Sequence, residues 1–332
     1  MKDITILGIQ PIGISLALSI KNSSLEVNKM MAYSENSDLI NSAKSLDIFD
    51  DVSKDIKKSI NGSTLIIIDS PLIEIPLIFE AINNSPTVKT VLNLNGSQVK
   101  CMDWASEKLN KNINYLGIRP ILKTDIPTIA DASDLVLEDL DICLMPKATT
   151  DNASIQNIVH LIEKIGATPY FLDVTEHDSY FTAMDKLSDV ISAAYINATT
   201  AKSSWIEMYK SAGIEFDHQS KNATKDPITN EAECLTLSDP LSYWIDEMII
   251  SLTKFKKTLK SENDDLLNYL VNAWEQKAKW ESGAMSQTPD SPHLPSAAEA
   301  MGNSILGSKL SKRLSGNQDA DKRHSWKYPK QG

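Results

Sequence analysis

The sequence predicts an α/β domain followed by an all-helical domain, and three observations support this prediction. Residues 3–145 alternate short β-rich apolar runs with helical patterns, as a parallel sheet with crossover helices requires. After Thr175 the pattern becomes helical throughout. At 332 residues the chain exceeds the roughly 250 residues at which a single hydrophobic core usually stops growing. We therefore expect two domains, 1–174 and 175–282, followed by a tail, 283–332.

Seven segments of the first domain are predicted to be strands, because each is a short apolar or β-branched run bounded by turn residues. They are "ITILG" (4–8), "KMMAY" (29–33), "TLIIID" (64–69), "TVLNL" (90–94), "INYLG" (113–117), "DICLM" (141–145) and "TPYFLDV" (168–174). A helix is expected before the last strand, because apolar residues recur at helical spacing from Ile155 to Ile165. Gly166 stands where a helix C-cap glycine belongs.

The turn "GIQPIG" after the first strand resembles a dinucleotide-binding turn with one glycine replaced. In such turns the first glycine permits the tight bend, the second lets the pyrophosphate approach, and the third lets the helix pack closely. Gly8 and Gly13 fill the first and third places, whereas Gln10 occupies the second and should obstruct the phosphates. Pro11 also removes an N–H that could have faced phosphate. A Rossmann-like dinucleotide-binding domain is therefore expected, but the sequence of its phosphate-binding turn is only partly that of a cofactor-binding protein.

The choice between NAD and NADP depends on the end of the second strand, where an acid normally holds the ribose hydroxyls. Ser34 stands there, followed by Glu35. A serine suits a 2′-phosphate better than an aspartate does, but no arginine is near in the sequence, so both cofactors remain open. The expected cofactor-binding residues are Gly8, Gln10, Ile12, Gly13, Ser34 and Ser70.

The second domain is expected to consist of helices. Thr175 and Asp178 have the spacing of a capping box, and the run from there to about Ser203 contains no Gly or Pro. Further helices are expected around Trp205 and Trp244, and from about residue 262 to 280. The tail is rich in Ser, Pro, Gly, Gln and Asn, which predicts disorder. Its basic residues fit either a solubilising tail or a docking segment for an acidic surface.

Composition excludes several functions. A net charge of −11 argues against a general nucleic-acid role, which needs a basic face. No apolar run approaches the roughly 20 residues that span a bilayer, and "MKDITILGI" is unlike a secretory signal. We therefore expect a cytoplasmic protein without membrane association. Cys101, Cys143 and Cys234 lack zinc-ligand spacing and are expected to be buried thiols, with no metal site.

Four segments, in order, resemble the prephenate/arogenate dehydrogenase family over roughly residues 3–281. They are "ITILGIQPIGISLALSIKNS", "NGSQVKCMDWASEKLNKNINYLGIRP", the run from "CLMPKATTDN" through "TEHDSYFTAMDKLSD" to "AAYINA", and "SKNATKDPITNEAECLTLSDPLSYWIDEMIISL". The resemblance implies NAD(P)-dependent oxidation of the ring hydroxyl of prephenate or arogenate with loss of the ring carboxylate, in tyrosine biosynthesis. It also implies that the helical domain joins two subunits into a homodimer.

Several positions that carry the family's chemistry differ here. The family's catalytic histidine falls on Arg119, which has only hydrogen-bond donors and stays protonated. The two histidines of its His-Leu-Pro-His helix fall on Lys186 and Asp189. The substrate-binding arginine falls on Lys221, which keeps the charge but loses the fork geometry suited to a carboxylate. Ser97 matches the serine of the family's Gly-Ser segment. The resemblance thus assigns catalytic positions to Arg119, Ser97, Lys186 and Asp189, and substrate binding to Lys221.

These replacements leave alternatives open. Lys186 is either a substrate-facing residue, which could act as a base if its pKa is lowered, or a solvated helix charge. Arg119 is either an anion contact in a strand-end loop or an inert replacement. Glu176, His177 and Asp178 match the family and are expected to cap a helix and to form interdomain hydrogen bonds.

Two functions follow. The first is an NAD(P)-dependent dehydrogenase with a small anionic substrate, held by Arg119 and Lys221. The second is a catalytically inactive family member that acts as a dimeric binding or regulatory module. The replacements at Gln10, Arg119 and Asp189 favour the second function, whereas the intact fold pattern favours the first.

Overall fold

A computed structural model describes residues 3–261 and 265–283. It divides into two compact units, of which the first ends at Asp246 and the second begins at Glu247. The boundary expected at residue 174 remains a prediction, because the first unit holds both the sheet and the helices as far as Asp246. Apart from Gly283, the predicted tail lies outside the described residues.

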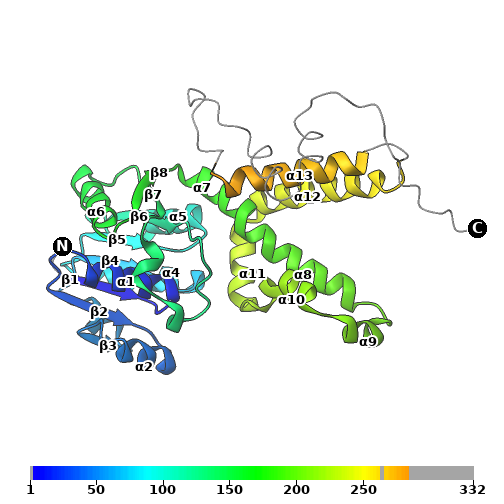
Figure 1. The fold of residues 1–332 in the computed structure, drawn as a ribbon. Coiled ribbons are helices and arrows are strands. Elements are labelled where there is room, and N and C mark those ends of the chain that lie inside the picture. Colours follow the sequence, from blue (N-terminus) through cyan, green and yellow to red (C-terminus); the bar gives the residue numbers. More distant parts are fainter. Residues whose placement is uncertain (1–2, 262–264, 284–332) are drawn as a thin grey trace, which may run out of the picture. The chain divides into compact units, whose positions relative to one another are not determined.

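An eight-stranded sheet forms the centre of the first unit in the described part of the chain (Figure 1). The strand order is β3-β2-β1-β4-β5-β6-β7-β8. The strands are β1 (Asp3–Leu7), β2 (Lys29–Tyr33), β3 (Asp51–Ser53), β4 (Leu65–Ile68), β5 (Thr90–Asn93), β6 (Asn114–Pro120), β7 (Asp141–Pro146) and β8 (Thr168–Phe171). Neighbouring strands are parallel except β6 and β7, which are antiparallel. The predicted Rossmann-like α/β fold is confirmed.

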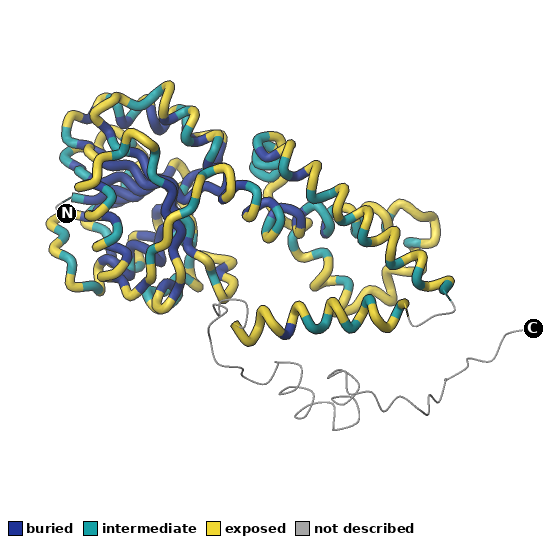
Figure 2. Tube along the Cα trace, turned by 90° about the horizontal axis from the view of Figure 1, so that it is seen from above, coloured by how far each residue is buried: buried dark blue, intermediate teal, exposed yellow. Residues whose placement is uncertain are grey.

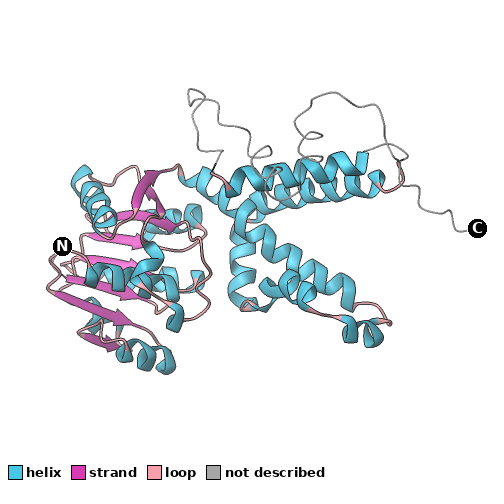
Figure 3. Ribbon diagram, in the orientation of Figure 1, coloured by secondary structure: helices cyan, strands magenta, loops and turns pink. Residues whose placement is uncertain are grey.

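Helices cover both faces of this sheet (Figure 3). Alternate strand residues enter two separate hydrophobic clusters: Leu65 and Ile67 pack on one face, and Ile66 and Ile68 on the other. This alternation follows from the two-residue period of a strand. The helices are α1 (Pro11–Asn22), α2 (Ser37–Ser45), α3 (Ile56–Ile60), α4 (Ile75–Asn83), α5 (Gln98–Lys108) and α6 (Asn152–Lys164). The first cluster contains side chains of α1 and α6, and the second contains side chains of α4 and α5.

Three details of the sheet differ from the prediction. β3 was not expected, because a three-residue segment is too short to show a strand pattern. β6 continues to Pro120, so Arg119 lies in a strand opposite Cys143 rather than in a loop. β8 ends at Phe171 because α7 begins at Val174. Gly166 has φ of +82° and ends α6 as expected.

The chain beyond β8 is helical, as predicted. The helices are α7 (Val174–Phe181), α8 (Leu187–Thr200), α9 (Trp205–Met208), α10 (Ile214–Ser220), α11 (Pro227–Thr236), α12 (Ser238–Thr258) and α13 (Asp265–Glu281). A π-helical turn, Thr182–Lys186, joins α7 to α8. Figure 2 shows buried residues concentrated in the sheet, whereas most residues of the later helices are intermediate or exposed. The expected homodimer remains a prediction.

The capping box predicted at Thr175 and Asp178 is wrong. Asp173 is the N-cap of α7, because its carboxylate accepts the N–H groups of Thr175 and Glu176 at 2.8 and 3.4 Å. Asp178 instead binds a different helix, α5.

The described residues contain no helix long and apolar enough to cross a membrane. The same part of the chain holds no cluster of three or more His, Cys, Asp or Glu residues placed to bind a metal ion. Cys101 and Cys143 are buried free thiols as expected, whereas Cys234 is half-buried.

Candidate functional site

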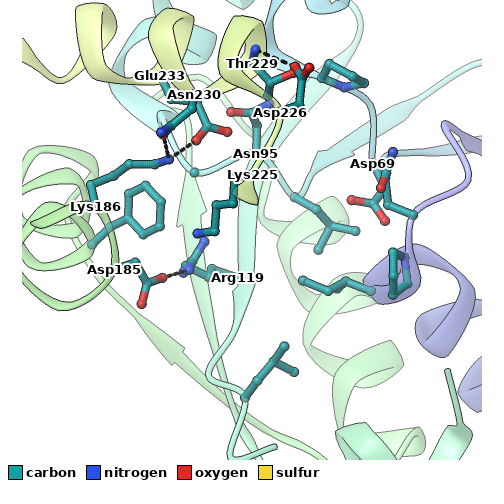
Figure 4. Close-up of a pocket in the computed structure, with 18 of the residues that line it drawn as sticks. Asp69, Asn95, Arg119, Asp185, Lys186, Lys225, Asp226, Thr229, Asn230 and Glu233 are labelled. Atoms are coloured by element: carbon teal, nitrogen blue, oxygen red, sulfur yellow. Dashed lines mark hydrogen bonds and ion pairs between the residues drawn. The ribbon is translucent and has the colours of Figure 1, made fainter. Parts of the chain in front are cut away.

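A cleft of about 720 Å³ lies at the carboxyl ends of β1, β4 and β5, beside Arg119 of β6 (Figure 4). The strand order reverses between β1 and β4, and parallel sheets commonly bind ligands at such a reversal. The loops after the strands form one wall. The residues from Phe181 to Ser188 and from Asn222 to Glu233 form the other. The cleft is therefore the candidate site.

The glycine turn is shaped by the segment that follows β4. Gly8 has φ of +87°, and a Cβ on it would lie 2.2 Å from the carbonyl oxygen of Asp69. A Cβ on Gly13 would lie 2.7 Å from Asp69 Oδ2. Gly8 is thus required both by its positive φ and by the Asp69 backbone, whereas a Cβ on Gly13 would collide with the Asp69 side chain. Gln10 is exposed and makes no side-chain capping bond to α1.

The side chain of Asp69, which follows β4, places its carboxylate at the start of α1. The backbone N–H of Gly13 donates to Asp69 Oδ2 at 2.6 Å. Burial raises the pKa of Asp69 to about 6, although the Gly13 hydrogen bond opposes this shift. The group is therefore mainly ionised at neutral pH. The start of α1 is the positive end of its helix dipole and favours anions. The carboxylate of Asp69 already occupies this position.

This arrangement does not fit the pyrophosphate of a dinucleotide. Pro11 has no N–H, the N–H of Gly13 is bonded to Asp69, and Gln10 replaces the glycine that allows close approach. Of the expected cofactor-binding residues, Gln10, Ile12 and Ser70 line the cleft. Ser34 is buried and accepts the N–H of Asn36 at 3.2 Å, and it is not among the lining residues.

Arg119 reaches the cleft as an ion-paired cation. Its guanidinium donates to the carboxylate of Asp185, which lies on the π-helical turn. The Arg119 Cζ also lies 4.1 Å from the centre of the Phe181 ring, a cation–π contact. A Cβ on Gly96 would lie 2.5 Å from the same ring, so the strand-end loop packs directly on it. Arg119 stands where the resemblance places the family's catalytic histidine, and its guanidinium is a hydrogen-bond donor held by Asp185 and Phe181.

Lys186 belongs to a buried charge cluster. Its ammonium donates to Asp189 Oδ2 and Asn230 Oδ1, each at 2.9 Å, and forms an ion pair with Glu233. Lys225 donates to Asp189 Oδ1 at 2.7 Å. Burial by itself would lower the pKa of Lys186, but Glu233 and Asp189 outweigh burial and raise it above its usual value. Lys186 is therefore not a solvated helix charge, and its pKa shift is opposite to the one a base would need. Because Lys186 lines the cleft, its substrate-facing role stays a prediction.

Lys221 lies outside the cleft lining. It is exposed and forms an ion pair with Asp125. The lysine that does line the cleft is Lys225, four residues later. The substrate-binding role expected for Lys221 therefore stays a prediction, and Lys221 is not one of the residues that line the cleft.

Ser97 is fully buried at the start of α5 and does not line the cleft. Its neighbours Gln98 and Val99 donate their backbone N–H groups to the Asp178 carboxylate, each at 2.9 Å. The Nδ1 of His177 also lies 2.9 Å from Asp178 Oδ1. Asp178, on α7, thus caps the start of α5, and both helices belong to the first unit. Its expected interdomain role stays a prediction, as does the boundary at residue 174.

The charges around the cleft are largely satisfied within the protein. The cations among its described lining residues each have a carboxylate partner: Arg119, Lys186 and Lys225. The lining carboxylates outnumber them: Asp69, Asp125, Asp185, Asp226 and Glu233. Sequence reasoning missed Asp69, Lys225 and Glu233 as parts of the site. An acid directly after a buried strand, beside the glycine turn, was the available signal for Asp69.

No protein-family model matches the sequence. Several solved structures are similar to this chain. Prephenate dehydrogenase from A. aeolicus, in complex with hydroxyphenyl propionate and NAD+, has a TM-score of 0.75 and 20% identity, over 84% of this chain and 98% of that one. Arogenate dehydrogenase from Synechocystis has a TM-score of 0.65 and 18% identity, over 84% and 100% of the two chains. A putative prephenate dehydrogenase from Corynebacterium glutamicum has a TM-score of 0.69 and 18% identity, over 85% and 89%. At these identities the likeness establishes the fold, and the chain has the fold of the prephenate and arogenate dehydrogenases that its four sequence segments resemble.

Proposed function

We propose that this chain is a diverged member of the prephenate/arogenate dehydrogenase family that binds a small ligand in the cleft beside Arg119 without oxidising it. The observation that carries this proposal is the ion pair between Arg119 and Asp185. It stands where the resemblance places the histidine that accepts the hydroxyl hydrogen bond.

Oxidation of a hydroxyl needs a group that accepts its proton. Arg119 has only donors and stays protonated. The raised pKa of Lys186 keeps this second candidate protonated as well. The carboxylate with a pKa near neutrality, Asp69, is bonded to Gly13 at the start of α1 rather than to the Arg119 group. The other carboxylates at this end of the cleft, Asp185 and Glu233, are already engaged in ion pairs with Arg119 and Lys186. No neutral imidazole stands where the resemblance places the family's proton acceptor.

The charge balance supports a ligand with at most one carboxylate. An anion can reach the Arg119 guanidinium by taking the place of Asp185, whose side chain is 45% exposed. The cations of the Lys186 cluster are less available, because Asp189 is buried and holds both Lys186 and Lys225. A ligand with two carboxylates would have to break that buried cluster, which is unfavourable.

A second candidate is an NAD(P)-dependent dehydrogenase with an altered small anionic substrate. The retained Gly8 and Gly13 and the position of the cleft favour it. In that case NAD or NADP would accept the hydride, the reaction would resemble the prephenate or arogenate step of tyrosine biosynthesis, and the protein would act in the cytoplasm as a homodimer.

Two measurements on the purified full chain test the proposal. The first follows the absorbance of the reduced nicotinamide, with prephenate or arogenate and with NAD+ or NADP+. We expect no turnover by the wild type, and measurable turnover would overturn the proposal in favour of the second candidate. The second is calorimetric titration with 4-hydroxyphenylpropionate, which has one carboxylate.

We expect 4-hydroxyphenylpropionate to bind the wild type and to lose about tenfold or more in affinity with Arg119→Ala. Lys58→Ala is the matched control, because it also removes a cation from an ion pair, at Asp51, away from the cleft. Binding that is unaffected by Arg119→Ala, or equally weakened by Lys58→Ala, would count against the Arg119 cleft.

A further inference from the structure

The start of α1 combines three features that bear on which ligands the cleft can hold. The helix begins with Pro11, which has no N–H, and the next lining residue is Ile12. The N–H of Gly13 points to Asp69 Oδ2 at 2.6 Å. The Asp69 carboxylate also fills the space that a Cβ on Gly13 would need, since Oδ2 and Cβ of Asp69 would lie 2.7 and 3.0 Å from it.

We propose that Asp69 is a built-in replacement for the phosphate of a dinucleotide, and that together with Gln10 it excludes nicotinamide dinucleotides from this cleft. A helix N-terminus binds phosphate through its free N–H groups and its positive dipole end. Asp69 places an anion at this positive end of α1 and accepts one of its free N–H groups, that of Gly13. This inference goes beyond the proposed function, which concerns the oxidation step at Arg119 and would hold with or without a bound dinucleotide.

Electrostatics strengthens the exclusion. Within residues 3–261 and 265–283 no cation forms an ion pair with Asp69, and its carboxylate accepts the N–H of Gly13. Its negative charge is therefore offset mainly by the helix. A pyrophosphate brought to the same place would meet a like charge at short range in a partly desolvated site, where charge repulsion is strong.

Asp69 takes the place of a local cap at the start of α1. N-cap residues normally satisfy the free N–H groups of a helix with their own side chains. Gln10 occupies the N-cap position of α1 and makes no such bond. The bond comes instead from a residue 56 positions away, at the end of β4, directly on the wall of the cleft.

The experiment compares the wild type with Gln10→Gly, Asp69→Asn and the double variant. Asp69→Asn keeps an oxygen acceptor for Gly13 while it removes the charge, so α1 keeps its hydrogen bond. Calorimetric titration with NAD+ and with ADP-ribose, which lacks nicotinamide, measures affinity. We expect no binding at micromolar strength by the wild type, and a gain of about tenfold or more for both probes in the double variant.

Two controls make the outcome specific. Asp125→Asn also removes one carboxylate charge from the lining, but Asp125 is paired with Lys221 rather than with an N–H of α1, so this variant should give no gain. Adenosine, which has no phosphate, should bind all variants alike. An equal gain with adenosine, or with Asp125→Asn, would overturn the phosphate-replacement role.

Two further results would also overturn the inference. One is micromolar binding of NAD+ by the wild type. The other is no gain in the double variant when circular dichroism and a cooperative unfolding transition show that it is folded. Neither result depends on the turnover and hydroxyphenylpropionate tests, so failure of this inference is distinguishable from failure of the proposed function.

Discussion

The Asp178 carboxylate accepts the backbone N–H of Gln98 at 2.9 Å, so α7 caps the start of α5. The same carboxylate holds the next N–H, that of Val99. Two free donors at a helix start are thus satisfied by one side chain that lies 80 residues along the chain. This contact fixes α7, and the π-helical turn after it, against the loop that carries Gly96 at the cleft.

Asp178→Ala is expected to destabilise the protein by roughly 2–3 kcal/mol, because it leaves two donors at a buried helix start without an acceptor. Urea unfolding followed by circular dichroism measures the loss. Asp173→Ala removes a carboxylate that accepts two N–H groups at the exposed start of α7 and should cost less. Equal losses would mean that water replaces Asp178 at α5.

Lys186→Met is expected to cost roughly 3 kcal/mol, because Asp189 and Glu233 would lose the cation that they share in a largely buried position. The free energy of unfolding from urea titration tests this. Lys58→Met breaks an exposed pair with Asp51 and should change stability little. A small effect of Lys186→Met would show that Lys225 alone compensates the cluster.

Gly8→Ala should be more destabilising than Gly62→Ala. Both glycines have positive φ, +87° and +85°, so an alanine is strained at either position. Only at Gly8 would the new Cβ also meet backbone, 2.2 Å from the Asp69 carbonyl oxygen, whereas nothing lies within 4 Å of it at Gly62. The difference in unfolding temperature between the two variants measures the cost of the contact between the new Cβ at position 8 and the Asp69 backbone. Equal losses would indicate that the β4 loop moves aside freely.

Asp69 gives a pH-dependent contribution to stability whose sign can be stated. Its pKa is raised to about 6 in the folded protein and is about 3.9 in an unfolded chain. The folded state therefore binds the proton more tightly, and stability falls as pH rises from about 4 to 6. Relative to Asp69→Asn, the wild type should lose on the order of 2 kcal/mol across this window. Parallel stability curves for the two proteins would contradict the raised pKa.

Much of the fold could be predicted because it depends on local pattern. Apolar runs such as "LIII" in β4 show a buried strand directly, and Gly166 marks the end of α6. β3 was not predicted because three residues are too few to show the alternating pattern of a strand. The cap of α7 was misplaced because Asp173, Thr175 and Asp178 all offer capping side chains, and only the packing of α5 decides which of them is used.

The site was less predictable, because its partners meet only in the folded chain. The resemblance placed Arg119 and Lys186 in the site. The partner of Arg119, Asp185, lies 66 residues away, and Asp69 lies 56 residues from Gly13. No spacing rule connects such pairs. Lys186 is likewise a buried, ion-paired cation rather than a base because it meets Glu233, which lies on α11 and is distant in the sequence.

The π-helical turn between α7 and α8 determines which sequence changes this region can tolerate. A π turn contains more residues per turn than an α-helix, and each residue of an α-helix advances the rotation by about 100°. Deleting one residue from Thr182–Lys186 would therefore rotate α8 relative to α7. Asp185 would turn from Arg119, and Asp189 from Lys225. Substitutions can alter individual charges here, but a single-residue insertion or deletion would separate both ion-pair groups at once.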